Sequence, residues 1–190
     1  NATNLGNGND TSNGSGGNDY IRGDDDNDTL NGGNGNDRLR GDDDNDVLNG
    51  QDGNDRLQGG NGFDKFDGGA TKDWLEVDSS DFTGGTRSIH GGAGIDVLDM
   101  GGIGNFTLTG NTTGVDGIEI INLEGGGDDT LSLKASDVTD IADGNELFIW
   151  GDSDDTVNLT NGGWSTIATG VAGSDGETYN VFQNGAVKVY

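Results

Sequence analysis

Cysteine and proline are both absent from the 190-residue chain, and His90 is its only histidine. The lack of cysteine excludes a disulfide framework and a thiolate metal site, so another interaction has to hold the chain together. One histidine is too few for an HExxH zinc site, and no GxSxG nucleophile motif occurs. The chain also lacks a run of about 18 apolar residues that could span a membrane, and no N-terminal signal peptide is visible. We therefore expect neither an enzyme active site nor membrane insertion.

Positive charge is scarce as well. Nine Lys and Arg residues stand against 35 Asp and Glu residues, which gives a formal net charge of −26. Such a surface repels nucleic acids and anionic membranes and attracts divalent cations. We expect no nucleic-acid partner, and a chain that is monomeric as a segment of a larger protein.

Apolar residues are few and unevenly spread. Residues 1–76 contain only ten Leu, Ile, Val and Phe residues, about 13%, whereas residues 77–190 contain 29, about 25%. We therefore expect two domains, 1–76 and 77–190. Burial in the first cannot offset the lost chain entropy, so that part is either disordered or completed by an ion.

The first part is a repeat. From Leu5 to Glu76 the chain divides without a gap into eight nine-residue units, in which we number the positions 1 to 9. Position 6 is aspartate in all eight units: Asp10, Asp19, Asp28, Asp37, Asp46, Asp55, Asp64 and Asp73. Position 8 is apolar in seven, with Ser12 as the exception: Ile21, Leu30, Leu39, Leu48, Leu57, Phe66 and Leu75.

A second period of 18 residues lies over the first, since Arg22–Leu39 and Arg40–Leu57 match at 15 of 18 positions. It predicts a coil with two units per turn, each unit giving a six-residue loop and a three-residue strand. Alternation in the strand turns position 8 inward and positions 7 and 9 outward. The solvent faces should then carry Arg22, Arg38, Arg40 and Arg56.

Stacking of the coils brings carboxylates together. Units n and n+2 lie one strand spacing apart, about 4.8 Å, so the position 6 aspartates form two ladders, each with three gaps. Carboxylates at that spacing repel one another unless a cation lies between them. Ca²⁺ takes six to eight oxygen ligands, whereas Mg²⁺ requires octahedral geometry and retains its waters. We predict about six Ca²⁺ ions, which would lower the formal charge from −26 to −14.

These units resemble the nonapeptide of the RTX (repeats-in-toxin) family, glycine-glycine-x-glycine-x-aspartate-x-apolar-x. The resemblance covers Leu5–Glu76 and implies an all-β fold, a parallel β-roll followed by a β-rich capping region. Aspartate tolerates the left-handed backbone that glycine favours at position 4, so Asp26 and Asp44 should preserve the loops. Thr71 at position 4 weakens the expectation for a site beside Asp73. The resemblance implies that the position 6 carboxylates hold Ca²⁺ together with residues of positions 1 to 4: Gly14, Gly17, Gly23, Asp25, Asp26, Gly32, Gly33, Asn34, Gly35, Gly41, Asp43, Asp44, Gly50, Asp52, Gly53, Gly59, Gly60, Asn61 and Gly62.

Beyond Val77 the sequence reads as short strands separated by glycine and asparagine turns. A helical turn is expected at residues 136–141, with Ser136 as its cap. One further repeat, GGAGIDVLD at residues 91–99, makes Asp96 a candidate ligand. Looser echoes of the repeat around Asp129 and Asp155 are either isolated Ca²⁺ sites or ordinary acidic turns. Together with Asp96 they would give the C-terminal region two or three Ca²⁺ ions beyond the six of the roll. We expect Trp74, Trp150 and Trp164 to pack in a core rather than to line a sugar site.

The stretch from Gly117 to Tyr190 resembles the closing region of large bacterial type I-secreted RTX adhesins. That resemblance implies export through the type I secretion apparatus, folding outside the cell where calcium is plentiful, and a location at the bacterial cell surface. The absence of cysteine and proline suits export of an unfolded chain, since no crosslink and no slow prolyl isomerisation intervenes. The alternative is the C-terminal RTX module of a secreted protease or lipase.

Overall fold

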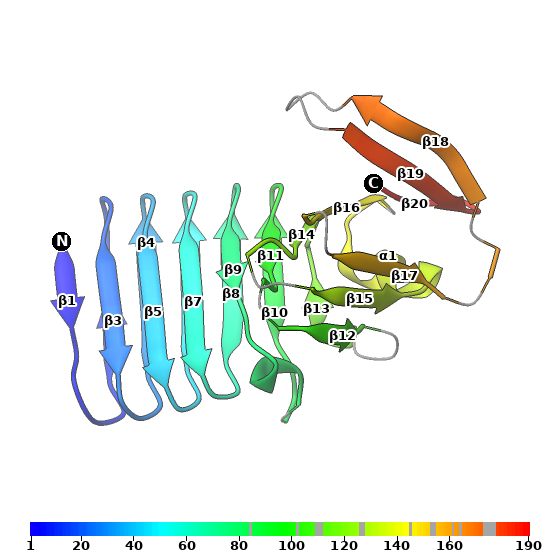
Figure 1. The fold of residues 1–190 in the computed structure, drawn as a ribbon. Coiled ribbons are helices and arrows are strands. Elements are labelled where there is room, and N and C mark those ends of the chain that lie inside the picture. The colour runs from blue at the N-terminus through cyan, green and yellow to red at the C-terminus, as the bar shows by residue number, and fades with distance from the viewer. Residues whose placement is uncertain are drawn as a thin grey trace.

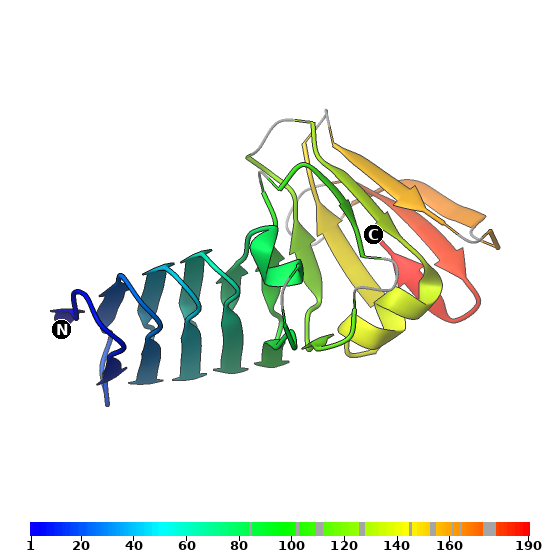
Figure 2. The same cartoon turned by 90° about the horizontal axis from the view of Figure 1, so that it is seen from below.

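The computed structural model describes residues 1–83, 85–101, 103–108, 112–125, 128–144, 146–152, 155–160, 162–163, 165–172 and 178–190. Its coils stack side by side along one axis, and the last strands and an α-helix gather at one end (Figures 1 and 2). The predicted all-β fold with a parallel β-roll is confirmed.

Two parallel sheets form the roll. The first sheet contains the strands β1 (Ala2–Asn4), β3 (Tyr20–Asp24), β5 (Arg38–Asp43), β7 (Arg56–Asn61) and β9 (Trp74–Glu76). The second sheet contains β2 (Thr11–Asn13), β4 (Thr29–Asn34), β6 (Val47–Asp52) and β8 (Lys65–Ala70). Paired residues differ by 18 in number, as in Leu30 with Leu48, so two nine-residue units make one coil as predicted.

The core of the roll consists of the position 8 side chains of both sheets, which form one buried cluster. These residues are at most 1% exposed: Ile21, Leu30, Leu39, Leu48, Leu57, Phe66 and Leu75. Arg38 and Arg56 are exposed and Arg22 and Arg40 half-buried, which confirms that positions 7 and 9 face outward.

The strands are longer than the sequence suggested. The prediction of three-residue strands with six-residue loops is wrong, because β4 to β8 each span six residues and only three residues separate them. Parallel pairing continues through positions 2 and 3, as in Gly33 with Gln51 and Asn34 with Asp52. The turn itself then joins the ladder, since the Gly35 N–H donates to the Asp52 carbonyl at 2.8 Å.

Position 4 needs a left-handed backbone, and the non-glycine residues there adopt it. Asp26 has φ 76° and Asp44 has φ 74°, which confirms that these loops survive the loss of glycine. Thr71 also adopts φ 76°, a conformation that a β-branched residue rarely takes. The loop beside Asp73 therefore keeps the same turn as the others.

Both sheets of the roll continue beyond residue 76. The second sheet gains β10 (Ile89–Ala93) and β13 (Val115–Asp116), and the first gains β11 (Val97–Asp99), β14 (Ile120–Asn122) and β16 (Glu146–Trp150). Residues 77–88, which include the 3₁₀ turn η1 (Ser80–Phe82), connect β9 to β10.

The C-terminal end adds a third parallel sheet and an antiparallel extension of the first. The third sheet consists of β12 (Asn105–Thr107), β15 (Thr130–Leu133) and β17 (Thr156–Leu159). The extension consists of β18 (Ser165–Ala172), β19 (Thr178–Asn184) and β20 (Val187–Val189). Trp74 and Trp150 pack together with ring centroids 6.4 Å apart, whereas Trp164 lies outside the described residues.

The predicted helix is present as α1 (Ala135–Ile141), but Ser136 is not its cap. Lys134 occupies the cap position, and its backbone N–H donates to Oδ2 of the buried Asp137 at 2.7 Å. The helix therefore begins one residue before the expected start, because an aspartate in its first turn satisfies the preceding amide.

Candidate metal centres

The position 6 aspartates lie in two rows, one at each edge of the roll. The first edge comprises the turns that lead from the first sheet to the second, and its row is Asp10, Asp28, Asp46, Asp64 and Asp81. The second edge comprises the opposite turns, and its row is Asp19, Asp37, Asp55, Asp73, Asp96 and Glu119. The structure thus brings together the predicted aspartates and lengthens both rows.

Within a row, each backbone amide binds the carboxylate of the next coil. The Asp37 N–H donates to Oδ1 of Asp55 at 2.7 Å, and the Asp28 N–H donates to Oδ1 of Asp46 at 2.8 Å. One oxygen of each carboxylate is therefore fixed, and the side chain is held along the axis of the roll.

The second oxygen of each buried carboxylate has no hydrogen-bond partner among the described residues. This holds for Oδ2 of Asp19, Asp28, Asp37, Asp46, Asp55, Asp64, Asp73 and Asp96. A buried, unpartnered carboxylate oxygen is costly, because its hydration is lost and nothing replaces it. A cation bound beside each of these oxygens would satisfy it.

Position 1 requires glycine because the carboxylate occupies the space beside it. A Cβ at Gly41 would meet Oδ2 of Asp46 and lie 2.7 Å from the Gly59 carbonyl oxygen. A Cβ at Gly50 would meet Oδ2 of Asp55 and lie 2.5 Å from the Gly68 carbonyl oxygen. Carboxylate and carbonyl oxygens from successive coils thus converge near the position 1 glycines of the repeat, with Gly59 as the exception. An all-oxygen donor set of this kind suits a hard cation such as Ca²⁺.

Burial makes these carboxylates reluctant to ionise in the absence of a cation. It raises the pKa of Asp46, Asp64 and Asp73 to about 7 and that of Asp55 and Asp96 to about 6. Burial also raises the pKa of Asp28 and Asp37.

A second set of ladders runs through position 5, which the sequence reasoning overlooked. The Asn54 N–H donates to the Asn36 side-chain oxygen at 3.0 Å, and the Asn45 N–H donates to that of Asn27 at 3.1 Å. These bonds point back along the roll, opposite to those of the aspartates. Their signal was present in the sequence, since position 5 is asparagine in the first six units: Asn9, Asn18, Asn27, Asn36, Asn45 and Asn54.

The two rows end differently. On the first edge, Asp81 accepts the Asp64 N–H at Oδ1 and the Asp78 N–H at Oδ2, so both of its oxygens are satisfied. Asp81 was missed because no nonapeptide surrounds it. At the other end, Asp10 is only half-buried, and Leu5 stands where the later units have glycine.

Asp129 and Asp155 form a separate short ladder on the third sheet. The Asp129 N–H donates to Oδ1 of Asp155 at 3.1 Å, and the Gly104 N–H donates to Oδ1 of Asp129 at 2.7 Å. Oδ2 of Asp155 accepts the Asp152 N–H at 2.8 Å. Neither residue belongs to the set with a buried unpartnered oxygen, and a Ca²⁺ site at either one stays a prediction.

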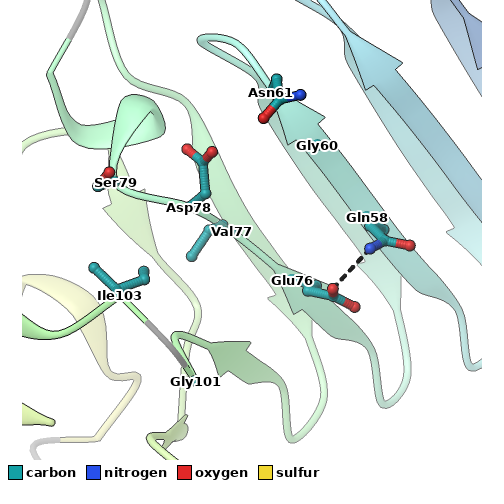
Figure 3. Close-up of a pocket in the computed structure, with 9 residues that line it drawn as sticks. All are labelled: Gln58, Gly60, Asn61, Glu76, Val77, Asp78, Ser79, Gly101 and Ile103. Atoms are coloured by element: carbon teal, nitrogen blue, oxygen red, sulfur yellow. Dashed lines mark hydrogen bonds between the residues drawn. The ribbon is translucent and has the colours of Figure 1, made fainter. Parts of the chain in front are cut away.

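A cavity of about 450 Å³ lies against the first sheet beside η1. Figure 3 shows Asn61, Asp78 and Ile103 around it, and the Gln58 side chain bound to Glu76 on one wall. The Glu76 oxygens are taken by Gln58 and Arg56, and the cavity holds none of the buried row aspartates. Nor do three His, Cys, Asp or Glu side chains converge anywhere in the described part of the chain, so the sites must take many ligands from backbone carbonyls.

A family model described as RTX calcium-binding nonapeptide repeat (4 copies) matches residues 5–39, 32–65 and 49–79. No curated protein and no solved structure gave a match. Within the described residues, no helix is both long and apolar enough to cross a membrane. The repeats, the parallel coils and the buried carboxylate rows agree with this match. Residues 5–79 therefore form an RTX β-roll, a calcium-binding structural module of secreted proteins.

Proposed function

We propose that this chain is the calcium-dependent structural module of a secreted bacterial RTX adhesin, which folds outside the cell when Ca²⁺ binds. One observation carries the proposal, namely the eight buried carboxylates that each hold one oxygen without a partner. Bound Ca²⁺ would supply positive charge and accept six to eight oxygen ligands. The roll buries too few apolar side chains to offset that cost by itself.

The chain's own residues would hold the ions in the gaps between successive coils. Each gap takes a position 6 carboxylate from each side and carbonyl oxygens from the loop positions 1 to 4. Of the six gaps first expected, five have a buried unpartnered oxygen beside a position 1 glycine. The gap between Asp10 and Asp28 lacks that glycine and should be the weakest. Two further gaps, Asp73–Asp96 and Asp64–Asp81, have both features. The first joins the set, because the carbonyl oxygen of the next coil also lies beside its glycine.

Several features support a role outside the cell. Calcium is scarce inside cells, so an unfolded chain could pass a type I secretion apparatus and fold only after export. The lack of cysteine and proline fits such a passage. The resemblance of residues 117–190 to the closing region of RTX adhesins favours an adhesin over a secreted protease or lipase. The sequence of the whole gene would distinguish these two.

Circular dichroism tests the proposal directly. The chain should show coil without calcium and cooperative gain of β structure as calcium is added, in the range of tens of micromolar to millimolar. Magnesium at the same concentration is the control and should give little structure. Equal β content with and without calcium would overturn the proposal.

A further inference from the structure

We propose a calcium site between Asp96 and Glu119, beyond the repeats that the family model matches. This inference rests on the proposed function, because it assigns one more site to the second edge. It concerns a coil that sequence reasoning left unassigned, in which a glutamate stands where every nonapeptide has aspartate.

The register places Glu119 as the next member of the row. Val97 pairs with Ile120, so Asp96 and Glu119 precede paired residues of β11 and β14. The Asp96 N–H donates to Oε2 of Glu119 at 2.9 Å, as the Asp55 N–H donates to Asp73 at 2.8 Å. The Ile120 N–H donates to the Asp96 carbonyl at 3.0 Å, as the Trp74 N–H donates to the Asp55 carbonyl at 2.9 Å. Both bonds of the repeat are therefore reproduced.

The close approach of the next coil's carbonyl oxygen to a position 1 glycine is reproduced as well. Ile89 pairs with Val115 and His90 with Asp116, which sets Gly117 beside Gly91. A Cβ at Gly91 would collide with the Gly117 carbonyl oxygen, just as one at Gly68 would collide with the Gly91 carbonyl oxygen. The oxygen that lines the earlier gaps is thus present in this one.

The turn that carries Glu119 is shorter than those before it. Five residues separate Gly91 from Val97, but only two separate Gly117 from Ile120. A glutamate side chain is one methylene longer than that of aspartate. Its carboxylate can therefore reach further from the backbone of this shorter turn. This explains why glutamate stands here, and why no nonapeptide pattern marked the site.

An independent observation points to a cation. Asp96 is 0% exposed, and its Oδ2 has no hydrogen-bond partner among the described residues. The second carboxylate is that of Glu119, whose Oε2 accepts the backbone N–H of Asp96. Burial and the carboxylates of Glu119 and Asp143 raise the pKa of Asp96 and outweigh the nearby Lys72, which lowers it. The Lys72 ammonium packs over the Trp150 ring, 5.7 Å from its centroid. Two carboxylates so placed require a positive partner.

The first edge supplies the contrast. Its last member, Asp81, is also 0% exposed, yet backbone amides satisfy both of its oxygens. A Cβ at Gly59, which precedes Asp64 in that gap, would lie 2.7 Å from the Phe66 ring instead of meeting a carbonyl of the next coil. Amides thus satisfy the last carboxylate of the first edge, although Oδ2 of Asp64 beside it has no partner among the described residues. On the second edge, both the unpartnered oxygen of Asp96 and the next coil's carbonyl oxygen are present beside Glu119.

Calcium stoichiometry of the full chain tests the site, measured by equilibrium dialysis at saturating calcium. Glu119→Gln keeps an oxygen that can accept the Asp96 N–H but removes the charge, and it should bind one ion fewer than the wild type. Asp96→Asn should bind two fewer, because Asp96 faces a gap on each side. Glu124→Gln removes the same charge from an exposed glutamate outside both rows, so it is the matched control and should bind the wild-type number.

Glu119→Asp distinguishes loss of the ligand charge from a folding defect, because it keeps the charge on a shorter side chain. It should bind the full number of ions with weaker affinity for one of them. An unchanged stoichiometry in Glu119→Gln overturns this site while leaving the proposed function intact. So does a loss of more than one ion in that variant, since Glu119 would then be a folding determinant. A wild type that binds no calcium overturns the proposed function itself.

Discussion

The two edges of the roll are built from the same turn but differ in how far it repeats. On the second edge the connection from the second sheet to the first stays short up to Glu119, and the carboxylate row runs with it. On the first edge, residues 77–88 and 100–114 insert longer connections, and the row stops at Asp81. The comparison shows that the row depends on the backbone turn and not on the nonapeptide pattern alone. A glutamate continues it where the backbone allows, and an aspartate ends it where amides take both oxygens.

The largest effect should come from placing a side chain in the space beside a position 1 glycine on either edge. Gly50→Ala on the second edge and Gly41→Ala on the first each place a Cβ against a carboxylate and the next coil's carbonyl. We expect each to lower the free energy of unfolding by about 3 kcal/mol or more. Urea denaturation at saturating calcium measures it.

Gly16→Ala is the control for these substitutions, since nothing lies within 4 Å of a Cβ there. It should change the unfolding free energy by less than about 0.5 kcal/mol. If Gly41→Ala were as mild as Gly16→Ala, the first edge would lack the tight coil contact described above.

Removing one member from the middle of a row is the next largest change. Asp37 lies between Asp19 and Asp55, so Asp37→Ala should abolish two adjoining calcium sites and leave the Asp19 amide without its acceptor. Asp24→Ala removes equal formal charge from the outward position 2 and should leave the calcium number unchanged. Equal losses in the two variants would mean that net charge, and not the row, determines binding.

Much of this arrangement could be predicted from the sequence. The invariant aspartate at position 6 and the apolar residue at position 8 predicted the coil, its core and the two rows. The 18-residue period places equivalent positions of successive coils directly beside one another. The rest lay outside the period. Asp81 enters the row through a 3₁₀ turn, and Glu119 through a turn that is three residues short. The cap at Lys134 depended on where Asp137 faces, which no local pattern specifies. Strand length was missed because loop amides also pair between coils, a property of stacking and not of one unit.

Acid should partly replace calcium. The pKa of Asp46 and Asp73 is about 7 in the ion-free fold, against about 3.9 for aspartate in an unfolded chain. Between these values the folded state binds more protons, so its stability falls as pH rises from about 4 to 7. Below about 4 both states are protonated and the gain is complete.

The measurement is circular dichroism on protein freed of calcium on a chelating resin, since soluble chelators weaken in acid. Going from pH 8 to pH 5 should increase the β content of this sample. Protein saturated with calcium is the control and should show no such gain. A fall in β content of the calcium-free sample at pH 5 would contradict the burial of these carboxylates.

The smallest effect should come from breaking the position 5 ladders. These variants test whether the two edges are equivalent within the repeats. Asn36→Ala on the second edge removes the acceptor of the Asn54 N–H, and Asn45→Ala on the first removes that of the Phe63 N–H. These groups are exposed, so water can replace the lost partner, and each variant should cost about 0.5–1.5 kcal/mol. Both should keep the wild-type calcium number, because asparagine oxygens here bind amides. The calcium midpoint, followed by circular dichroism, should rise by a similar factor in both. A larger shift for Asn36→Ala would show that the second edge differs from the first within the repeats as well as at its end.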